Sequence, residues 1–434
     1  MSQSNDNSTR VVVTGQGLVT PLGRNTPDIH SRWMSGRSAA ATISKFDASN
    51  LPVSIGCEVA DFEPRQEIRN RKLLRLLMRG EDFGVVASAS AFADAGLSNE
   101  DYDPARAGIA IGVRKEGFCH SNFNDALEVC TGGGTIDRAL FMEEGMRRIP
   151  PQTIIEGLAN AGLYHIAHEH VLQGVNHNLL CLGTGGFHAI GEAMWSLRND
   201  EADLILAGAF DSWILWTGIA HEHYTGVLSS STDDPSTVHR PFDVTRTGSV
   251  VGEGAALFVL ETLERALQRG ANVLGEILGF GAATGVPSFD PHGCAAAVTA
   301  CVRRALDVAN LTPADIDLMH LHGDATEQGD RIEVQGLQAA LGERACTIPA
   351  TTIKSTTGFM ANASSSVETA AVLEVLRTGI IPPIANLTTP DPAFDLNFVR
   401  EPLDGQPLRH ALLIERSWPS HYAALIVGTP DDQR

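Results

Sequence analysis

The chain has 434 residues, 43% of them hydrophobic and 19% charged, and its formal net charge is −20. This composition is typical of a globular protein long enough for one large core or for two halves that share a core. The negative charge argues against a nucleic-acid partner because phosphates would be repelled, and no apolar run reaches the roughly 18 residues that a membrane span needs.

Strands and helices alternate along the sequence. Short apolar runs predict strands at 10–15, 107–113, 175–182, 202–209, 254–260 and 273–280. Helical periodicity covers 73–95 and 185–197, and between them 114–150 is expected to form loops and short helices. The alternation favours an α/β fold with sheets buried between helices.

A weak internal similarity suggests a duplication. The strand, glycine turn and helix at 175–197 resemble those at 351–377, and the opening strand has a possible counterpart at 273–280. If this similarity is real, the two halves meet near 260–270.

Three local patterns have more than one interpretation. The glycines of 131–134 suggest a loop or a phosphate-binding turn, but the GxxxxGK[ST] pattern is absent. The cluster His168, Glu169 and His170 fits a solvated helix face better than a metal site, so we predict no metal. Seven scattered cysteines without a CxxC pair indicate reduced thiols, and with the polar, non-signal start we expect a cytoplasmic protein.

A strand, a glycine-rich bend and a helix follow one another around Gly183. Such an elbow displays a nucleophile at a helix N-terminus, where backbone N–H groups favour a thiolate. Gly183 has no side chain, so the elbow is present without a nucleophile.

Five stretches in order carry a family resemblance. They lie at 11–23, 239–255, 322–333, 354–358 and 381–399. Together they resemble the β-ketoacyl-acyl-carrier-protein synthase family, of the elongating type, within the thiolase superfamily, over residues 10 to 428. The resemblance implies a five-layer αβαβα fold with two pseudo-repeated halves, predicted here as 10–265 and 266–430. It also implies dimers joined through a strand beside the active site, an acyl carrier protein as partner, and no cofactor.

The family's reaction is a decarboxylative Claisen condensation, and its residues map onto this chain unevenly. The nucleophilic cysteine falls on Gly183, whereas the first histidine and the lysine are retained as His322 and Lys354. The second histidine is replaced by Phe359, and 417–422 replaces the family's glycine-rich closing loop. A thiolate and donors for the developing negative charge are what condensation requires.

Supporting positions are also implied. Asp330 and Glu333 match the acidic residues after the first histidine, and Glu333 is a candidate partner for Lys354, because a buried lysine needs one. His322 is either a donor to a thioester or enolate oxygen, or a hydrogen-bonded core histidine. His320 is expected to be structural.

Two residues of the elbow could in principle replace the nucleophile. Cys181 is expected inside the strand, as a buried structural cysteine rather than a relocated nucleophile. Thr184 has no evident base and is expected to cap the following helix.

A basic segment stands out in this acidic chain. It comprises Arg69, Arg71, Lys72 and Arg75. It is either a docking face for an acidic carrier protein or a solvated helix face.

The leading functional hypothesis is a ketosynthase-like subunit that pairs with an active ketosynthase and shapes the acyl-chain tunnel. It resembles the chain-length factors of type II polyketide synthases, which commonly carry glutamine rather than glycine at the cysteine position. The alternatives are an enzyme that acts on acyl or malonyl thioesters through His322 and Lys354, by decarboxylation, acyl transfer or hydrolysis, and a homodimeric acyl-binding scaffold.

Overall fold

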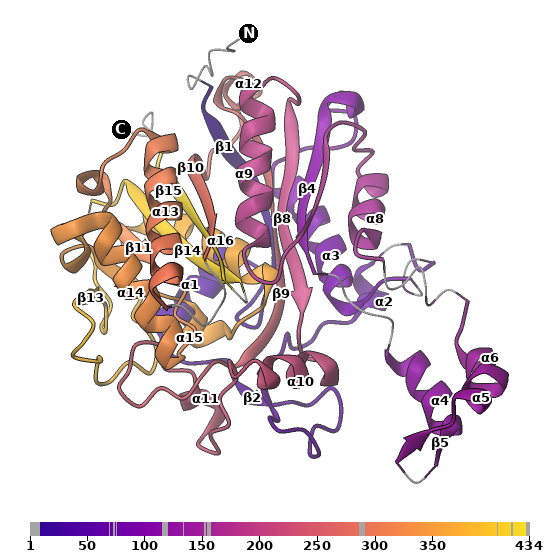
Figure 1. Ribbon diagram of the computed structural model, residues 1–434. Coiled ribbons are helices and arrows are strands. Elements are labelled where there is room, and N and C mark those ends of the chain that lie inside the picture. Colours follow the sequence, from indigo (N-terminus) through magenta and orange to yellow (C-terminus); the bar gives the residue numbers. More distant parts are fainter. Residues whose placement is uncertain are drawn as a thin grey trace.

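Hydrogen-bonded strands form one continuous path through the computed structural model (Figure 1). The structure describes residues 9–430 except 69, 73, 75, 115–119, 133, 152, 154–157, 286–290, 406, 418 and 419. The first group of strands, in spatial order, is β1 (Val11–Val19), β9 (Val251–Thr262), β8 (Leu204–Ser212), β4 (Ala107–Val113) and β7 (Asn176–Leu180). The second group is β10 (Gly275–Thr284), β15 (His421–Gly428), β14 (His410–Ser417), β11 (Leu318–His320), β12 (Pro349–Thr351) and β13 (Asn397–Phe398). Two short strands, β2 (Ala41–Thr42) and β3 (Ile55–Cys57), extend from β9.

The two groups repeat one pairing pattern. In the first, β1–β9 and β9–β8 are antiparallel, and β8–β4 and β4–β7 are parallel. In the second, β10–β15 and β15–β14 are antiparallel, and β14–β11 and β11–β12 are parallel. The groups join where Val11–Val13 pairs with β10. This repetition supports the predicted duplication, while the division at 265/266 stays a prediction.

Helices lie outside and between the two groups of strands. On the outer face of the first group lie α3 (Arg79–Asp94) and α8 (Ala161–Glu169); between the groups lie α9 (Gly185–Arg198) and α16 (Asn362–Thr378); and on the outer face of the second lie α13 (Pro291–Ala309) and α14 (Glu327–Leu341). Shorter helices are α1 (Thr26–Met34), α2 (Pro64–Glu67), α10 (Trp216–Tyr224), α11 (Pro235–Val238), α12 (Leu263–Gln268) and α15 (Lys354–Thr357). The result is a five-layer αβαβα arrangement.

The central layer explains the sequence of its helices. In α9 the predicted apolar residues Phe187, Ile190, Met194 and Leu197 are all buried. In α16 every residue from Asn362 to Leu376 is buried, because strands of both groups cover it. Serine, threonine and alanine dominate its first half, where large side chains would keep the layers apart.

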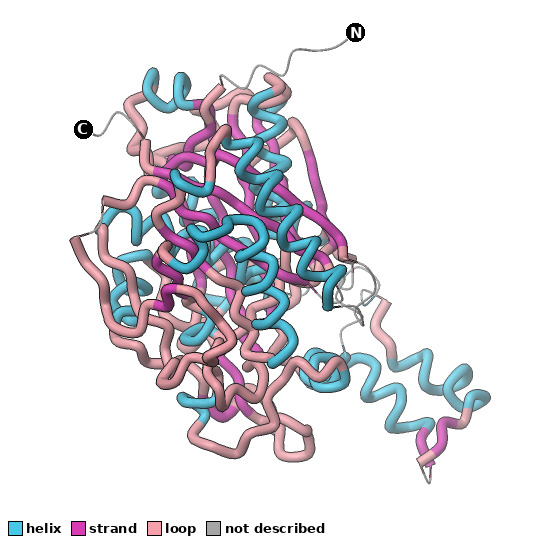
Figure 2. Tube along the Cα trace, turned by 60° about the vertical axis from the view of Figure 1, so that its left-hand side comes forward, coloured by secondary structure: helices cyan, strands magenta, loops and turns pink. Residues whose placement is uncertain are grey.

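An arm stands off from the body in two views (Figures 1 and 2). Its elements are α4 (His120–Cys130), β5 (Thr131–Gly132), β6 (Thr135–Ile136), α5 (Arg138–Leu140), a π-helical turn (Phe141–Gly145) and α6 (Met146–Arg148). Ile136, Met142 and Met146 are exposed on it. Within the predicted loops and short helices of 114–150, the elements from His120 to Arg148 therefore form a projecting unit, which we call the arm. Over the described parts of the chain, no helix has both the length and the apolar character that crossing a membrane requires.

Candidate functional site

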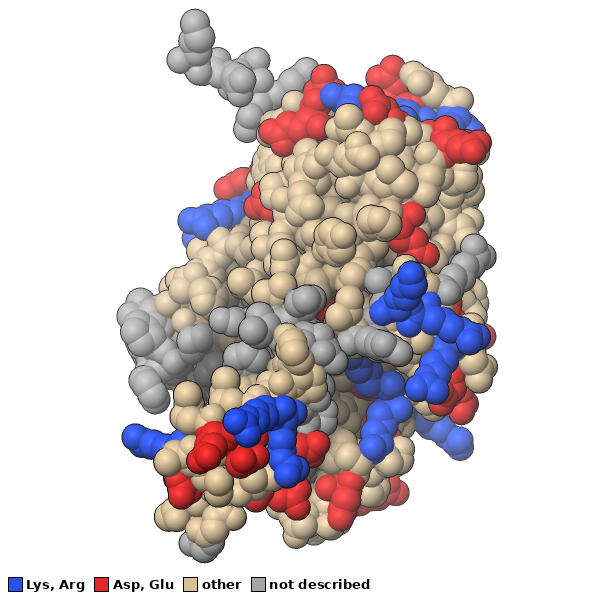
Figure 3. Space-filling view, turned by 90° about the vertical axis from the view of Figure 1, so that its right-hand side faces the viewer, with Lys and Arg blue, Asp and Glu red and all other residues tan. Residues whose placement is uncertain are grey.

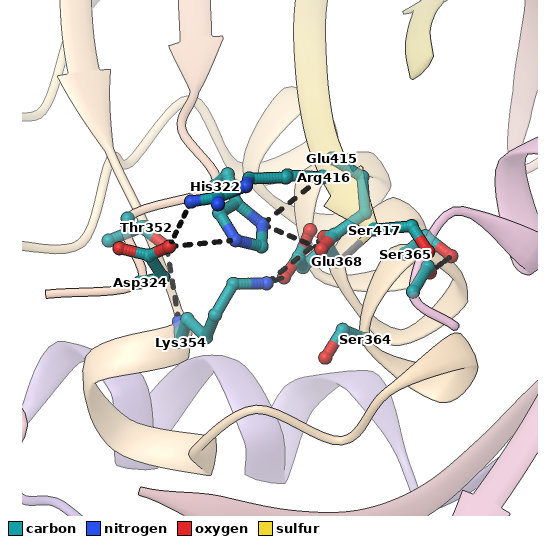
Figure 4. A network of polar contacts seen from close by, with 12 residues as sticks. His322, Asp324, Thr352, Lys354, Ser364, Ser365, Glu368, Glu415, Arg416 and Ser417 are labelled. Carbon is teal, nitrogen blue, oxygen red and sulfur yellow. Dashed lines mark hydrogen bonds and ion pairs between the residues drawn. The ribbon is translucent and has the colours of Figure 1, made fainter. Parts of the chain in front are cut away.

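Lys354 is fully buried at the start of α15, between two carboxylates from different elements (Figure 4). Its Nζ contacts Glu368 Oε1 of α16 and lies 3.0 Å from Glu415 Oε2 of β14. Burial lowers the pKa of Lys354, but the two carboxylates outweigh burial and raise that pKa above its usual range. The expected partner Glu333 is thus not the one observed, because α16 and β14 bring closer carboxylates.

His322 lies beside the same carboxylate. Its Nδ1 is 2.6 Å from Glu415 Oε1, and the Arg416 N–H points at that nitrogen from 3.3 Å (Figure 4). The side chain is 6% exposed. Burial, followed by the charge of Lys354, lowers the pKa of His322 to about 3, so the ring is neutral at physiological pH.

Asp330 and Glu333 hold the loop that carries His322. Glu333 accepts the backbone N–H groups of His322 at 2.6 Å and Gly323 at 3.0 Å. Asp330, three residues earlier on the same face of α14, accepts those of Phe242 at 2.7 Å and Ala325 at 3.1 Å. Burial raises the pKa of Glu333 to about 8. Both acids therefore position backbone and do not reach toward a ligand.

A small pocket lies beside His322, and an ion pair forms part of its lining. Arg416 Nη1 is 2.8 Å from Asp324 Oδ2, and that oxygen is 3.9 Å from His322 Nε2. Burial alone would raise the pKa of Asp324, but Arg416 holds it below its usual range. The pocket is lined by Leu182, Glu222, Val227, His322, Asp324, Phe359 and Arg416. Its volume is about 20 Å³, which leaves room for a single water-sized group.

Phe359 fills the position where the resemblance places a second histidine. Its ring meets the His322 ring edge to face, with centroids 6.0 Å apart, and Lys354 Nζ lies 5.7 Å from its centroid. An apolar ring with a cation over it replaces a hydrogen-bond donor here.

The elbow at Gly183 has no room for a side chain. A Cβ atom there would lie 2.5 Å from the carbonyl oxygen of Arg416 and 3.3 Å from Ser417 Cα. The N–H groups that open α9 already have acceptors: Gly185 donates to Asn362 Oδ1 at 3.1 Å and Gly186 to Ser365 Oγ at 3.0 Å. The backbone at the end of β14 thus occupies the space that a nucleophile would need.

Two expectations for the elbow are wrong. Thr184 stands at the N-cap of α9, but its side chain makes no capping hydrogen bond, since α16 supplies the acceptors. Cys181 lies one residue beyond β7 and is only partly buried, because the strand ends at Leu180.

Cys181 lines a cavity at the elbow with a volume of about 460 Å³. Leu180, Cys181, Leu182, Thr184, His188, Ala282, Ala283, Thr284, Arg304, Ser417, His421 and Tyr422 line it. Burial raises the pKa of the Cys181 thiol. His188 Nδ1 lies 3.0 Å from the Thr184 carbonyl oxygen.

The remaining sequence-based candidates are scattered. His320 is buried and its Nε2 accepts the Ile353 N–H at 3.1 Å, which is a structural contact. His168 and Glu169 are exposed, whereas His170 is buried against Phe92, so the solvated-face interpretation is wrong for that histidine.

The basic segment lies after α2. Arg71 and Lys72 are exposed, while the predicted residues 69 and 75 lie outside the described part of the chain. Figure 3 shows Lys and Arg gathered on one side of the face that carries α2 and the arm. Exposed Arg65 lies in α2, and exposed Arg24 pairs with Glu67 of the same helix.

Sequence reasoning missed Glu368, Glu415, Asp324 and Arg416. The charged residues Glu415 and Arg416 directly follow the apolar run Ala411–Ile414. Because charges at the end of a buried strand need partners, this pattern could have marked both as candidate site residues.

Comparisons with known proteins agree with this architecture. Residues 8–266 match the family described as beta-ketoacyl synthase, N-terminal domain, and residues 274–388 match beta-ketoacyl synthase, C-terminal domain. The chain is 32% identical to the 3-oxoacyl-[acyl-carrier-protein] synthase 2 of Coxiella burnetii, covering 90% of this chain and 91% of that protein. It is 31% identical to the tetracenomycin polyketide synthase ketoacyl synthase alpha subunit of Streptomyces glaucescens, covering 98% of each.

Solved structures confirm the predicted thiolase-type fold. The ishigamide ketosynthase/chain length factor superposes with a TM-score of 0.84 at 28% identity, covering 97% of this chain and 99% of that one. A type II polyketide ketosynthase, solved with its acyl-carrier protein and bound to the hexaketide, gives a TM-score of 0.82 at 25% identity, covering 98% of this chain and 100% of that one.

Proposed function

The chain belongs to the β-ketoacyl synthase family, and from that membership we propose that it is a non-condensing ketosynthase-like subunit of a polyketide or fatty-acid pathway. It pairs with a cysteine-bearing ketosynthase and helps to shape the tunnel for the growing acyl chain. One observation carries the proposal: a side chain at position 183 would meet the Arg416 carbonyl oxygen at 2.5 Å. The chain therefore lacks both the nucleophile and the space for one.

The loss of the donor at position 359 supports the same conclusion. Condensation needs preorganised donors where the enolate charge develops. Phe359 supplies none, and Arg416 is engaged by Asp324. With nucleophile and donor both replaced, this chain contributes structure to the reaction rather than the condensing step.

Exposed apolar side chains and an open strand edge support pairing with another chain. In the described residues, β7 pairs only with β4, so its other edge is free to accept a strand. Leu180 at the end of β7 is 59% exposed, and the arm exposes Met142 at 68%. Exposed apolar side chains, one of them beside an open strand edge, favour a protein partner. The similar ishigamide structure is a ketosynthase/chain length factor.

Co-expression with a cysteine-bearing ketosynthase from the same gene neighbourhood tests the pairing. We expect a stable 1:1 complex in size-exclusion chromatography with light scattering. Leu180→Glu should break it, whereas Tyr224→Glu, at a side chain 91% exposed on α10, should leave it intact. A chain that forms only homodimers beside such a partner would favour the scaffold hypothesis instead.

The basic face after α2 is proposed to dock an acyl carrier protein. Opposite charge speeds the encounter of such partners and is screened by salt. Arg71→Glu combined with Lys72→Glu should weaken carrier binding several-fold at low salt, as measured by surface plasmon resonance on the complex. Arg409→Glu, an exposed charge before β14, serves as the control. Equal affinities for both variants would assign Arg71 and Lys72 to a solvated surface.

The retained Lys354–Glu415–His322 network favours a second candidate, turnover of a thioester without a covalent intermediate. The small volume of the pocket beside His322, about 20 Å³, weighs against it, because ligand sites are usually much larger. Consumption of malonyl or acyl thioester by the purified chain, abolished in His322→Ala, would establish this candidate and overturn the non-condensing subunit.

A further inference from the structure

The cavity beside Cys181 is large enough for a ligand of its own. Its volume of about 460 Å³ lies within the range usual for small-molecule sites, about 300–1,000 Å³. Its walls come from six elements of the fold, namely β7, α9, β10, α13, β14 and β15, together with the elbow. His322 and Lys354 do not line it, so other groups must recognise whatever it holds.

The charge of this cavity is positive and unbalanced. Arg304 of α13 is exposed, and its Nη1 donates to the Ala282 carbonyl oxygen at 2.5 Å, which holds the guanidinium at the cavity wall. The described contacts of Arg304 include no carboxylate, and none of the described lining residues is acidic. Its Nε and Nη2 hydrogens are therefore available, and they form the planar fork that matches a carboxylate or a phosphate.

Neutral groups of the cavity add to this preference. The buried Ser417 accepts the Leu182 N–H at 3.1 Å through its Oγ, and its own hydroxyl hydrogen has no acceptor in the described contacts. Thr184, at the N-cap of α9, also lines the cavity, so the positive end of that helix dipole lies at its wall. Both features favour a ligand that carries negative charge.

We propose that this cavity binds a small organic anion. The guanidinium of Arg304 holds its carboxylate or phosphate group, the Ser417 hydroxyl is a further donor, and a short apolar part packs against Leu182, Ala282 and Ala283. This function is additional to the proposed pairing role and does not rest on it, because every group that it uses belongs to this chain.

Saturation-transfer NMR on the full chain tests the preference for an anion. The probe is butyrate, and butyramide is its neutral counterpart of similar size. We expect butyrate to bind more tightly, because only the anion gains a charge-assisted hydrogen bond from Arg304. Displacement of butyrate by inorganic phosphate would show that phosphate esters are also accepted, whereas no displacement would restrict the site to carboxylates. Equal binding of butyrate and butyramide would overturn the proposal.

Two neighbouring arginines of α13 provide matched variants. Arg304→Met should weaken butyrate binding by roughly tenfold or more, because it removes the charged donor. Arg303→Met should leave binding unchanged, since Arg303 donates to the Ala339 carbonyl oxygen at 2.8 Å and does not line the cavity. Both arginines are exposed, so both variants should fold. Unchanged affinity in Arg304→Met would contradict the assigned site.

Cys181 reports whether the anion lies in the cavity. Bound butyrate should slow the alkylation of Cys181 by iodoacetamide several-fold and leave that of exposed Cys346 unchanged, as measured by peptide mass spectrometry. Undiminished alkylation of Cys181 at saturating butyrate would place the anion elsewhere and overturn the proposal. The non-condensing role would be unaffected by that result, because complex formation and product formation test it separately.

Discussion

The two sides of the Arg416–Ser417 backbone differ sharply. On one side lie His322 and Lys354 in a dense network of ion pairs, beside a pocket of about 20 Å³. On the other side lies Cys181 in a cavity of about 460 Å³, with no carboxylate among its lining residues. The residues typical of the family's chemistry thus lie beside the small pocket, and none of them lines the larger cavity.

The difference shows that the family's motif residues can be retained at a place where a substrate has little room. His322, Lys354 and Glu333 keep their places because each satisfies a buried partner, whether a carboxylate or a backbone N–H. Gly183 packs against the end of β14, and its missing Cβ allows the Arg416 carbonyl oxygen to approach the elbow. Substitutions on the two sides should therefore have different effects on stability and on reactivity.

The largest effect is expected from Lys354→Met, which leaves Glu368 and Glu415 buried without their cation. Breaking a buried ion pair on one side costs about 3–5 kcal/mol of unfolding free energy. Urea denaturation should show this loss, with Lys72→Met, at an exposed lysine, as the control within about 0.5 kcal/mol. A loss below about 1 kcal/mol would mean that the network is not a structural element.

A smaller effect is expected from Gly183→Cys. The new Cβ must push back the Arg416 backbone, which should cost about 1–3 kcal/mol of unfolding free energy, as other overpacked sites do. Condensation should not appear, because Phe359 remains. Gly132→Cys, where nothing lies within 4 Å, is the matched control and should be near neutral. Product formation by the single Gly183→Cys variant would contradict the assignment of this chain as non-condensing.

The smallest effect concerns thiol chemistry on the open side. Cys181 should be alkylated by iodoacetamide more slowly than exposed Cys346 but faster than fully buried Cys57, as followed by peptide mass spectrometry. Burial raises the pKa of the Cys181 thiol, and only the thiolate reacts, so its alkylation rate should still rise with pH above the ordinary thiol pKa of about 8.5. A rate equal to that of Cys57 at every pH would place Cys181 outside the cavity.

Much of the fold could be predicted from the sequence because its motifs occur in order and the apolar periodicity of α9 matches its burial. The site was harder to predict. Glu415 and Glu368 reach Lys354 only after β14 and α16 have packed, and their distances along the chain, 61 and 14 residues, give no local signal. Cys181 was misplaced because its exposure depends on the point at which β7 ends, and strand ends are poorly marked by apolar runs.

Product formation by the reconstituted pair tests the central claim most directly. This chain would be combined with a cysteine-bearing ketosynthase, a carrier protein and malonyl substrate, and either partner would be altered in turn. We predict that product formation is lost when the cysteine of the ketosynthase is replaced by alanine, and that it persists when His322 of this chain is. Condensation by this chain alone, or its loss in the pair carrying His322→Ala while the complex stays assembled, would contradict the account.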